Sequence, residues 1–150
     1  GELWIRGPQV MQGYLNNEAA TAVTLDADGW LHTGDLATVD ASSIYRIVDR
    51  LKELIKYRGY QVPPAVLEAV LLQHPDIADA AAIGALDDDG QEFPKAFVVR
   101  RPGSELTGEQ VMDFVAERVA PHEKVRAVTF IDAIPKSTSG KILRRDLKGR

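Results

Sequence analysis

The fold of this chain is decided by the stretch LKELIKYRGYQVPP at residues 51–64. Two strand-like runs, Leu54–Tyr57 and Tyr60–Val62, flank the pair Arg58-Gly59, and this arrangement is typical of a tight β-hairpin. Pro63-Pro64 then opens a helix, because proline is tolerated in the first helical turn. The sequence therefore predicts a hairpin that leads directly into a helix.

The residues that follow this stretch alternate between helical and strand patterns. Apolar residues between Val66 and Leu71 share one face at helical spacing, and His74-Pro75 ends this helix. Further along we expect strands at Ile77–Leu86 and Phe93–Arg100, a helix opened by the capping pair Thr107 and Gln110, a strand at Ala127–Ile131, a polar loop at Pro135–Gly140 and a short helix at Lys141–Lys148. This order predicts an α+β domain in which helices cover a small sheet.

The residues that precede the stretch show short strand-like runs broken by turns. We expect strands at Leu3–Arg6, Gln9–Tyr14, Trp30–His32, Leu36–Val39 and Ile44–Val48, and a short helix within Asn17–Leu25. The change of pattern predicts three parts: a β-rich segment at 1–49, a hinge at 50–52 and an α+β domain at 53–150. Because the chain starts within a strand-like run and without Met, we expect it to be a piece of a longer protein.

Composition and charge exclude several classes of protein. Lys and Arg number 18 against 22 Asp and Glu, and the net charge of −4 is not that of a nucleic-acid-binding protein. The chain has no cysteine, which excludes disulfides, thiolate zinc sites and a cysteine nucleophile. Because His32, His74 and His122 lie far apart in the sequence, we expect no metal site built on them. No apolar stretch is long enough to span a membrane.

Charged positions in the first part suit a nucleotide ligand. Asp35 follows Gly34 in a predicted tight turn, and a carboxylate there can accept both hydroxyl hydrogens of a ribose. Arg50 could hold a second side of the ribose or a phosphate, and Lys52 lies where a hinge would absorb backbone rotation. The ordinary alternatives are a Gly-Asp turn and a charged linker.

Two loops in the second part could also contact a ligand. The Ser-, Thr- and Gly-rich segment Pro135–Lys141 ends in a lysine at the predicted entry of a helix, and a long cation there suits a transient negative charge. It is not a Walker A loop, because Pro135 and Ile142 replace the required residues. Gly59 at the hairpin tip would let a ligand approach the backbone closely. The ordinary alternatives are a solvated basic tail and a hairpin whose tyrosines half-cover the core.

The order of these motifs resembles the C-terminal part of the adenylate-forming enzyme superfamily. The residues that carry the resemblance are Gly1–Pro8, Met11, Gly13-Tyr14, Gly29–Asp35, Asp49–Val62 and Pro135–Lys141. The resemblance extends from Gly1 to about Leu147. Within the superfamily, Asp49–Pro63 and Lys136–Leu147 are most similar to the acyl-CoA synthetase and 4-coumarate-CoA ligase branch.

The resemblance implies an AMP-forming acid–thiol ligase. In such enzymes a carboxylate attacks the α-phosphate of ATP, with Mg²⁺, to give an acyl-adenylate and pyrophosphate. The thiol of coenzyme A then attacks the acyl carbon and releases AMP. Residues 1–49 would be the β-rich end of the large N-terminal domain, and 53–150 the small mobile domain that rotates between the two steps. The main ATP and Mg²⁺ sites and the acyl pocket would precede Gly1, so we expect the chain alone to be inactive.

The resemblance also implies roles for individual residues. In adenylation, Asp35 would bind the ribose hydroxyls of ATP, Arg50 would contact the ribose or phosphates, and Lys141 would stabilise charge on the α-phosphate and the attacking carboxylate. In the rotated state, Gly59 would line the passage for the pantetheine of coenzyme A, and Lys56 and Gln61 would lie near the reacting centre. Lys52 would be the hinge residue, and no residue of this chain would bind metal.

Two other functions stay open at this point. The chain could belong to an adenylation domain that hands its acyl group to a carrier protein, or be a non-catalytic binding module that reuses the fold. The catalytic positions of Asp35, Arg50 and Lys141 favour an enzyme over a binding module. We further expect a cytoplasmic protein, a carboxylic acid, ATP and CoA as its substrates, and no nucleic-acid partner. The apolar residues of 1–49 would be exposed, disordered or paired with a second copy.

Overall fold

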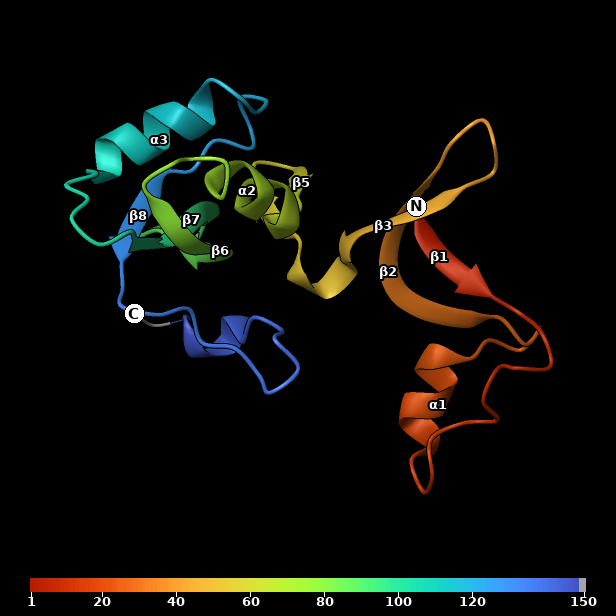
Figure 1. The fold of residues 1–150 in the computed structure, drawn as a ribbon. Coiled ribbons are helices and arrows are strands. Elements are labelled where there is room, and N and C mark those ends of the chain that lie inside the picture. The colour runs from red at the N-terminus through yellow and green to blue at the C-terminus, as the bar shows by residue number, and fades with distance from the viewer. Residues whose placement is uncertain (149–150) are drawn as a thin grey trace. The chain divides into compact units, whose positions relative to one another are not determined.

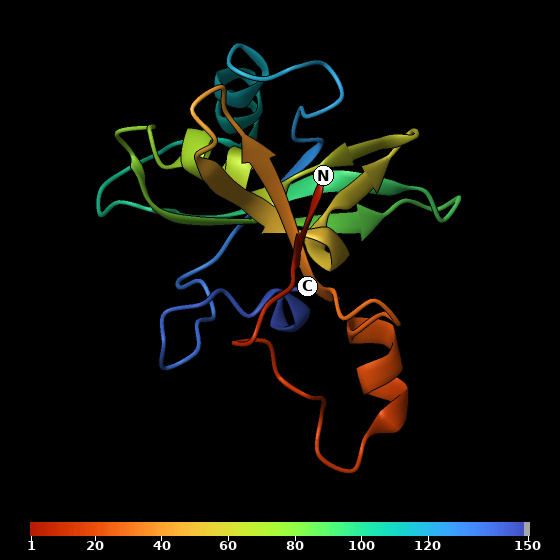
Figure 2. The ribbon, with the colours of Figure 1, turned by 90° about the vertical axis from the view of Figure 1, so that its right-hand side faces the viewer.

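The computed structural model describes residues 1–148 and divides the chain into two compact units, Gly1–Lys52 and the unit from Glu53 onward (Figures 1 and 2). The helices and small sheets confirm the α+β fold class predicted from the sequence. Residues 149 and 150, the end of the predicted C-terminal domain, lie outside the described residues. Within residues 1–148 we find no helix with the length and apolar character that crossing a bilayer requires.

The first unit is an antiparallel three-stranded sheet with one short helix. Its elements are β1 (Glu2–Ile5), α1 (Glu18–Thr24), β2 (Leu31–Val39) and β3 (Tyr45–Arg50), and β2 is the central strand. Figure 1 shows β2 as a long curved ribbon between β1 and β3. Asn17 begins α1, because its side chain accepts a hydrogen bond from the backbone N–H of Ala20 at 3.0 Å.

The middle of β2 differs from the prediction of two strands separated by a turn at Gly34-Asp35. The strand is continuous, and Gly34 adopts a φ of +71° within it, which glycine tolerates. The register between β1 and β2 shifts at this point and leaves extra residues on β2, so the strand bulges. Glu2 Oε1 accepts a hydrogen bond from Gly34 N–H at 3.0 Å, and Thr33 Oγ1 donates to the Leu3 carbonyl at 2.7 Å. Side chains of both strands therefore satisfy backbone groups at the bulge, Glu2 that of Gly34 and Thr33 that of Leu3.

The predicted strand at Gln9–Tyr14 is wrong, because this segment has no strand partner in the described chain. Its backbone is satisfied in other ways. Val10 N–H donates to the Gly7 carbonyl at 3.1 Å in a local turn. Tyr14 N–H donates to Thr21 Oγ1 of α1 at 2.9 Å. The bond from Tyr14 holds the end of the segment against α1 instead of against the sheet.

The second unit begins at the last residue of a 3₁₀ turn, and its residues 53–148 form two sheets and two α-helices. In chain order its elements are η1 (Leu51–Glu53, which joins the units), β4 (Ile55–Tyr57), β5 (Tyr60–Val62), α2 (Pro64–Leu71), β6 (Ile77–Leu86), β7 (Glu92–Arg100), α3 (Gly108–Ala116), β8 (Ala127–Phe130) and η2 (Arg144–Asp146). β4 and β5 form the predicted hairpin. In the main sheet β7 is central, antiparallel to β6 and parallel to β8.

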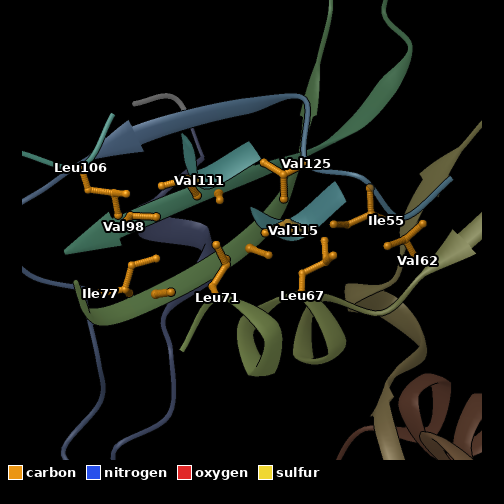
Figure 3. Close-up of a cluster of buried hydrophobic side chains, with 13 residues drawn as sticks. Ile55, Val62, Leu67, Leu71, Ile77, Val98, Leu106, Val111, Val115 and Val125 are labelled. Carbon is orange, nitrogen blue, oxygen red and sulfur yellow. The ribbon is translucent and has the colours of Figure 1, made fainter. Parts of the chain in front are cut away.

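The larger core lies between the two helices and one face of the main sheet (Figure 3). Leu67 and Leu71 of α2, Val111 of α3 and Val98 of β7 all belong to this core, and all four side chains are fully buried. The Thr107 side chain opens α3 with the predicted capping box, accepting from Gln110 N–H at 3.3 Å. Burial of these apolar side chains is the main favourable contribution to the folding of the unit.

The opposite face of the same sheet is covered by the C-terminal segment. Alternate residues of β6 point to opposite faces, so Ala80 and Ala82 join the larger core while Ala81 and Ile83 join a second one. Leu147 completes this second core and is fully buried. A strand that is apolar on both faces is thereby covered on both.

The predicted helix at Lys141–Lys148 is wrong, because only the 3₁₀ turn η2 forms there. Ile142 instead makes an isolated β-bridge with Lys136, and Leu147 is drawn into the second core. The tertiary contacts of Ile142 and Leu147 thus outweigh the modest helix propensity of this segment.

Candidate functional site

Asp35 and Arg50, the two predicted nucleotide-binding residues of the first unit, form an ion pair. They lie directly opposite each other on β2 and β3, and Arg50 Nε is 2.7 Å from Asp35 Oδ1. Asp35 directly follows Gly34 in the bulge, and its N–H donates to Thr33 Oγ1 at 3.1 Å. The pair fixes one carboxylate oxygen, and the remaining acceptor positions of Asp35 can still accept two hydroxyl groups. Arg50 therefore orients the carboxylate that the sequence predicts to bind a ribose.

The predicted residues Lys56 and Gln61 are brought together on the β4–β5 hairpin. They are directly opposite each other across the hairpin, so their exposed side chains leave the same face. Arg58 and Gly59 have φ values of +48° and +84°, as a tight primed turn requires. Gly59 is exposed at the tip, where the backbone is open to a ligand.

A carboxylate of the main sheet holds this hairpin in place. Glu92 Oε2 accepts a hydrogen bond from Lys56 N–H at 2.9 Å. The Glu92 side chain crosses Gly84 of β6, where any Cβ would collide with its carboxylate. The absence of a side chain at Gly84 therefore gives the Glu92 side chain the space in which it reaches the hairpin. No local sequence pattern predicts this contact.

The hairpin tip adjoins an aromatic and cationic pocket that no sequence pattern predicts. Its lining residues are Tyr57, Arg58, Tyr60, Pro121, His122 and Arg126. The rings of Tyr60 and His122 stack with centroids 4.2 Å apart, and the guanidinium of Arg126 lies 5.2 Å from the centre of the Tyr57 ring. A flat ring can stack in such a pocket, and its guanidinium groups can pair with a phosphate.

Lys141 lies on an ordered loop and not at the entry of a helix. Ser137 N–H donates to the Lys141 carbonyl at 2.8 Å, and Lys141 N–H donates to Ser137 Oγ at 3.2 Å. Lys136, on the same loop, is held by Asp79 at 2.6 Å. The Lys141 side chain is exposed and makes no ion pair within residues 1–148. The loop thus presents one available ammonium group on a backbone that is closed by hydrogen bonds between Ser137 and Lys141.

The guanidinium of Arg144, for which no sequence pattern predicts a role, anchors the segment after this loop. Arg144 Nη2 donates to Glu68 Oε1 and Oε2 at 2.8 and 2.9 Å, and Arg144 Nη1 donates to Glu53. Arg144 Nε also donates to the Ala82 carbonyl at 3.2 Å. Glu68 is the one buried charged residue among residues 1–148. The apolar helical pattern around it does not predict that it pairs with Arg144.

The predicted site residues therefore form three groups. Asp35 and Arg50 are paired in the first unit, Lys56 and Gln61 share a face of the hairpin, and Lys141 lies on its own loop. Both views show this blue loop apart from the hairpin (Figures 1 and 2). Lys52, the predicted hinge residue, is exposed in η1 between the two units. Among the described residues, no group of three or more His, Cys, Asp or Glu side chains is placed to hold a metal ion.

Comparison with known protein families gives a match that covers half of the chain. The family described as "AMP-binding enzyme C-terminal domain" matches residues 66–141. This region begins in α2 and ends at Lys141.

Individual relatives match both units. A 4-coumarate–CoA ligase-like protein of Arabidopsis thaliana is 57% identical over 147 residues, 98% of this chain and 26% of the relative. The 4-coumarate:CoA ligase 1 of Petunia hybrida is 54% identical over 150 residues, all of this chain and 28% of the relative. The chain thus spans about a quarter of the length of these curated relatives.

A solved structure has the same fold. It is the o-succinylbenzoate CoA synthetase of Bacillus subtilis in complex with the acyl-adenylate intermediate, with a TM-score of 0.88 and 34% identity. The alignment covers 100% of this chain and 30% of that one.

Proposed function

This chain belongs to the family of AMP-binding enzyme C-terminal domains, and on that premise we propose that it is the C-terminal part of an AMP-forming acyl- or aryl-CoA ligase. The observation that carries the proposal is the 57% identity to a CoA ligase-like protein over 98% of the chain. The identity includes the first unit, which lies outside the matched family region. The enzyme would join a carboxylic acid to coenzyme A with ATP, in two steps.

In the first step the carboxylate oxygen of the acid attacks the α-phosphorus of ATP, and pyrophosphate leaves. We assign Asp35 to the ribose hydroxyls, with Arg50 holding the carboxylate in place. The exposed ammonium of Lys141 would approach the α-phosphate and the attacking carboxylate, where it would stabilise the negative charge of the transition state. Mg²⁺ would neutralise phosphate charge, and its ligands would lie outside this chain.

In the second step the sulfur of coenzyme A attacks the acyl carbon, and AMP leaves. We assign the β4–β5 hairpin to this step, with Gly59 beside the pantetheine and with Lys56 and Gln61 near the reacting centre. The aromatic and cationic pocket at the hairpin tip has the chemistry to hold the nucleotide end of coenzyme A. A rotation at Lys52 would exchange the Lys141 loop for the hairpin.

The test uses the full-length protein that contains this chain. It is incubated with ATP, Mg²⁺ and a panel of aromatic and aliphatic carboxylic acids, and both pyrophosphate release and CoA thioester formation are measured. We expect at least one acid to support both. Lys141→Ala is expected to slow adenylation about 100- to 1000-fold while sparing thioester formation from a supplied acyl-adenylate. Lys148→Ala, which removes an exposed lysine from the same segment, is the matched control.

Three results would count against the proposal or redirect it. No acid-dependent pyrophosphate release with any acid would contradict ligase function and favour a binding module. Pyrophosphate release with acyl transfer to a carrier protein, but not to coenzyme A, would favour the carrier-dependent alternative. Thioester formation by the purified 150 residues would contradict our expectation that this chain alone is inactive.

A further inference from the structure

Arg144 joins elements of the second unit that are distant in sequence. Its guanidinium contacts Glu53 at the end of η1, Glu68 in α2 and the Ala82 carbonyl in β6. These partners are 91, 76 and 62 residues away along the chain. Only 18% of the Arg144 side chain is exposed, so solvent screens these interactions less than those of a surface pair. Arg144 also lies three residues after Lys141, directly behind the loop.

Apolar contacts alone would not fix the direction of this segment. Leu147 is fully buried and Ile142 packs against the same core, so the segment is already attached to the sheet. Hydrophobic contacts have little directional preference, whereas a guanidinium bound to both oxygens of a carboxylate has a defined orientation. The contacts of Arg144 therefore set the orientation of the backbone that leads back to Lys141.

The same contacts join the loop to the start of the second unit. Glu53 directly follows the predicted hinge residue Lys52, and the second unit begins at Glu53. The ion pair between Arg144 and Glu53 thus connects the residue after the hinge to the segment that carries Lys141. A rotation of the backbone at the hinge would then move Glu53 and the Lys141 loop together.

We infer that Arg144 is a positioning residue, which holds the Lys141 loop in a fixed orientation relative to the hinge through Glu53 and Glu68. The inference rests on the proposed adenylation role of Lys141. Arg144 contacts no reacting atom in this scheme, and it acts through Lys141. A residue of this kind should matter for adenylation, in which Lys141 takes part, and much less for the thioester step.

The experiment measures both half-reactions in the full-length enzyme for Arg144→Ala, Lys141→Ala and the double variant. We expect Arg144→Ala to lower the rate of adenylation about 100-fold, because small displacements of a catalytic group have effects of this size. Thioester formation from a supplied acyl-adenylate should stay within about threefold of wild type. In the Lys141→Ala background, Arg144→Ala should cause less than about a threefold further loss, because residues that act as a unit are not additive.

The neighbouring residue provides a matched control. The Arg145 side chain is 85% exposed and its ion pair within the described chain is with the neighbouring Asp146, so Arg145→Ala should change adenylation less than about threefold. Arg144→Lys keeps the charge but loses the two-oxygen contact with Glu68, and we expect it to lower adenylation about tenfold. This variant carries the test if Arg144→Ala does not fold, and thermal melting of every variant identifies that case.

The possible outcomes separate this inference from the proposed function. An active wild-type enzyme with an unimpaired Arg144→Ala variant would overturn the positioning role alone. Equal losses in both half-reactions, or a loss that multiplies with that of Lys141→Ala, would show that Arg144 only stabilises the fold. A wild-type enzyme without acid-dependent pyrophosphate release would overturn the proposed function, and this inference with it.

Discussion

Gly1–Lys52 and the unit from Glu53 onward contain the same kinds of secondary structure but bury very different amounts of apolar surface. Within residues 1–148, Ala37 is the only buried hydrophobic residue of the first unit, whereas the second unit has two cores. Large apolar side chains of the first unit are exposed instead, at Trp4, Met11, Tyr14, Leu15, Val23, Val39, Ile44, Tyr45 and Ile47. The expected exposed apolar surface of 1–49 is thus present. Hydrogen bonds shape both units, but only the second has the burial that normally stabilises a domain.

The largest expected difference is between the two units as separate fragments. We expect residues 53–150 to fold alone, because both cores and the Arg144 cluster lie within them. Residues 1–52 alone should lack cooperative unfolding, because a small sheet without a core is marginal in water. Circular dichroism and thermal melting of the two fragments measure this. A cooperative melt of the 1–52 fragment would break the comparison.

A smaller effect is expected from matched substitutions of one apolar residue in each unit. Leu67→Ala removes a fully buried side chain from the larger core and should lower the free energy of unfolding by about 3 kcal/mol. Ile47→Ala removes a side chain that is 57% exposed and should change it by less than about 0.5 kcal/mol. Chemical denaturation of residues 1–150 measures both. Similar losses for both variants would mean that Ile47 is buried in solution by a partner or a second copy.

Removal of a helix cap should lower the free energy of global unfolding by about 1 kcal/mol in the second unit and should not lower it in the first. Thr107→Ala deletes the capping box of α3, whose residues Val111 and Val115 are in the larger core, so the loss of about 1 kcal/mol should appear in global unfolding. Asn17→Ala deletes the cap of α1, which has no buried residue, so only local fraying is expected. Hydrogen exchange resolves the two cases. Global destabilisation by Asn17→Ala would contradict the comparison.

The smallest expected effect is a loss of stability at acid pH in two turns of the first unit. The side chain of Arg46 and the backbone N–H of Ile44 lower the pKa of Asp40, and the backbone N–H of Trp30 lowers the pKa of Asp26. A lowered pKa means that each carboxylate stabilises its turn above the pKa of the unfolded chain and loses this contribution as the pH falls through the folded value. We therefore expect these turns to loosen below about pH 4.

Amide resonances provide the measurement for this prediction. Ile44 and Trp30 amides should shift as their carboxylate partners are protonated, while Val111 in α3 serves as the reference for the second unit. If the amide shifts of Ile44 and Trp30 changed with pH no more than that of Val111, the two carboxylates would not be what stabilises these turns at higher pH.

Local patterns were predicted well where neighbouring residues settle the structure. The predicted hairpin around Arg58-Gly59 is present, with both residues at positive φ, and strand Ile77–Leu86 has the predicted bounds. The capping pair of Thr107 and Gln110 also needs only residues three apart. The order of the motifs was sufficient to identify the superfamily, and the positions of Asp35, Arg50 and Lys141 followed from that resemblance. Their catalytic roles stay predictions.

What the sequence by itself determined is therefore the local hairpin, caps and strands and the family to which the chain belongs. Only the tertiary structure decided that Gly34-Asp35 lies in a bulge held by β1, that Arg50 pairs with Asp35, and that Arg144 binds Glu68 from 76 residues away. The physical reason is that these contacts join residues far apart in the chain. Their partners are chosen by the packing of whole elements, whereas propensity and periodicity act only over a few neighbouring residues.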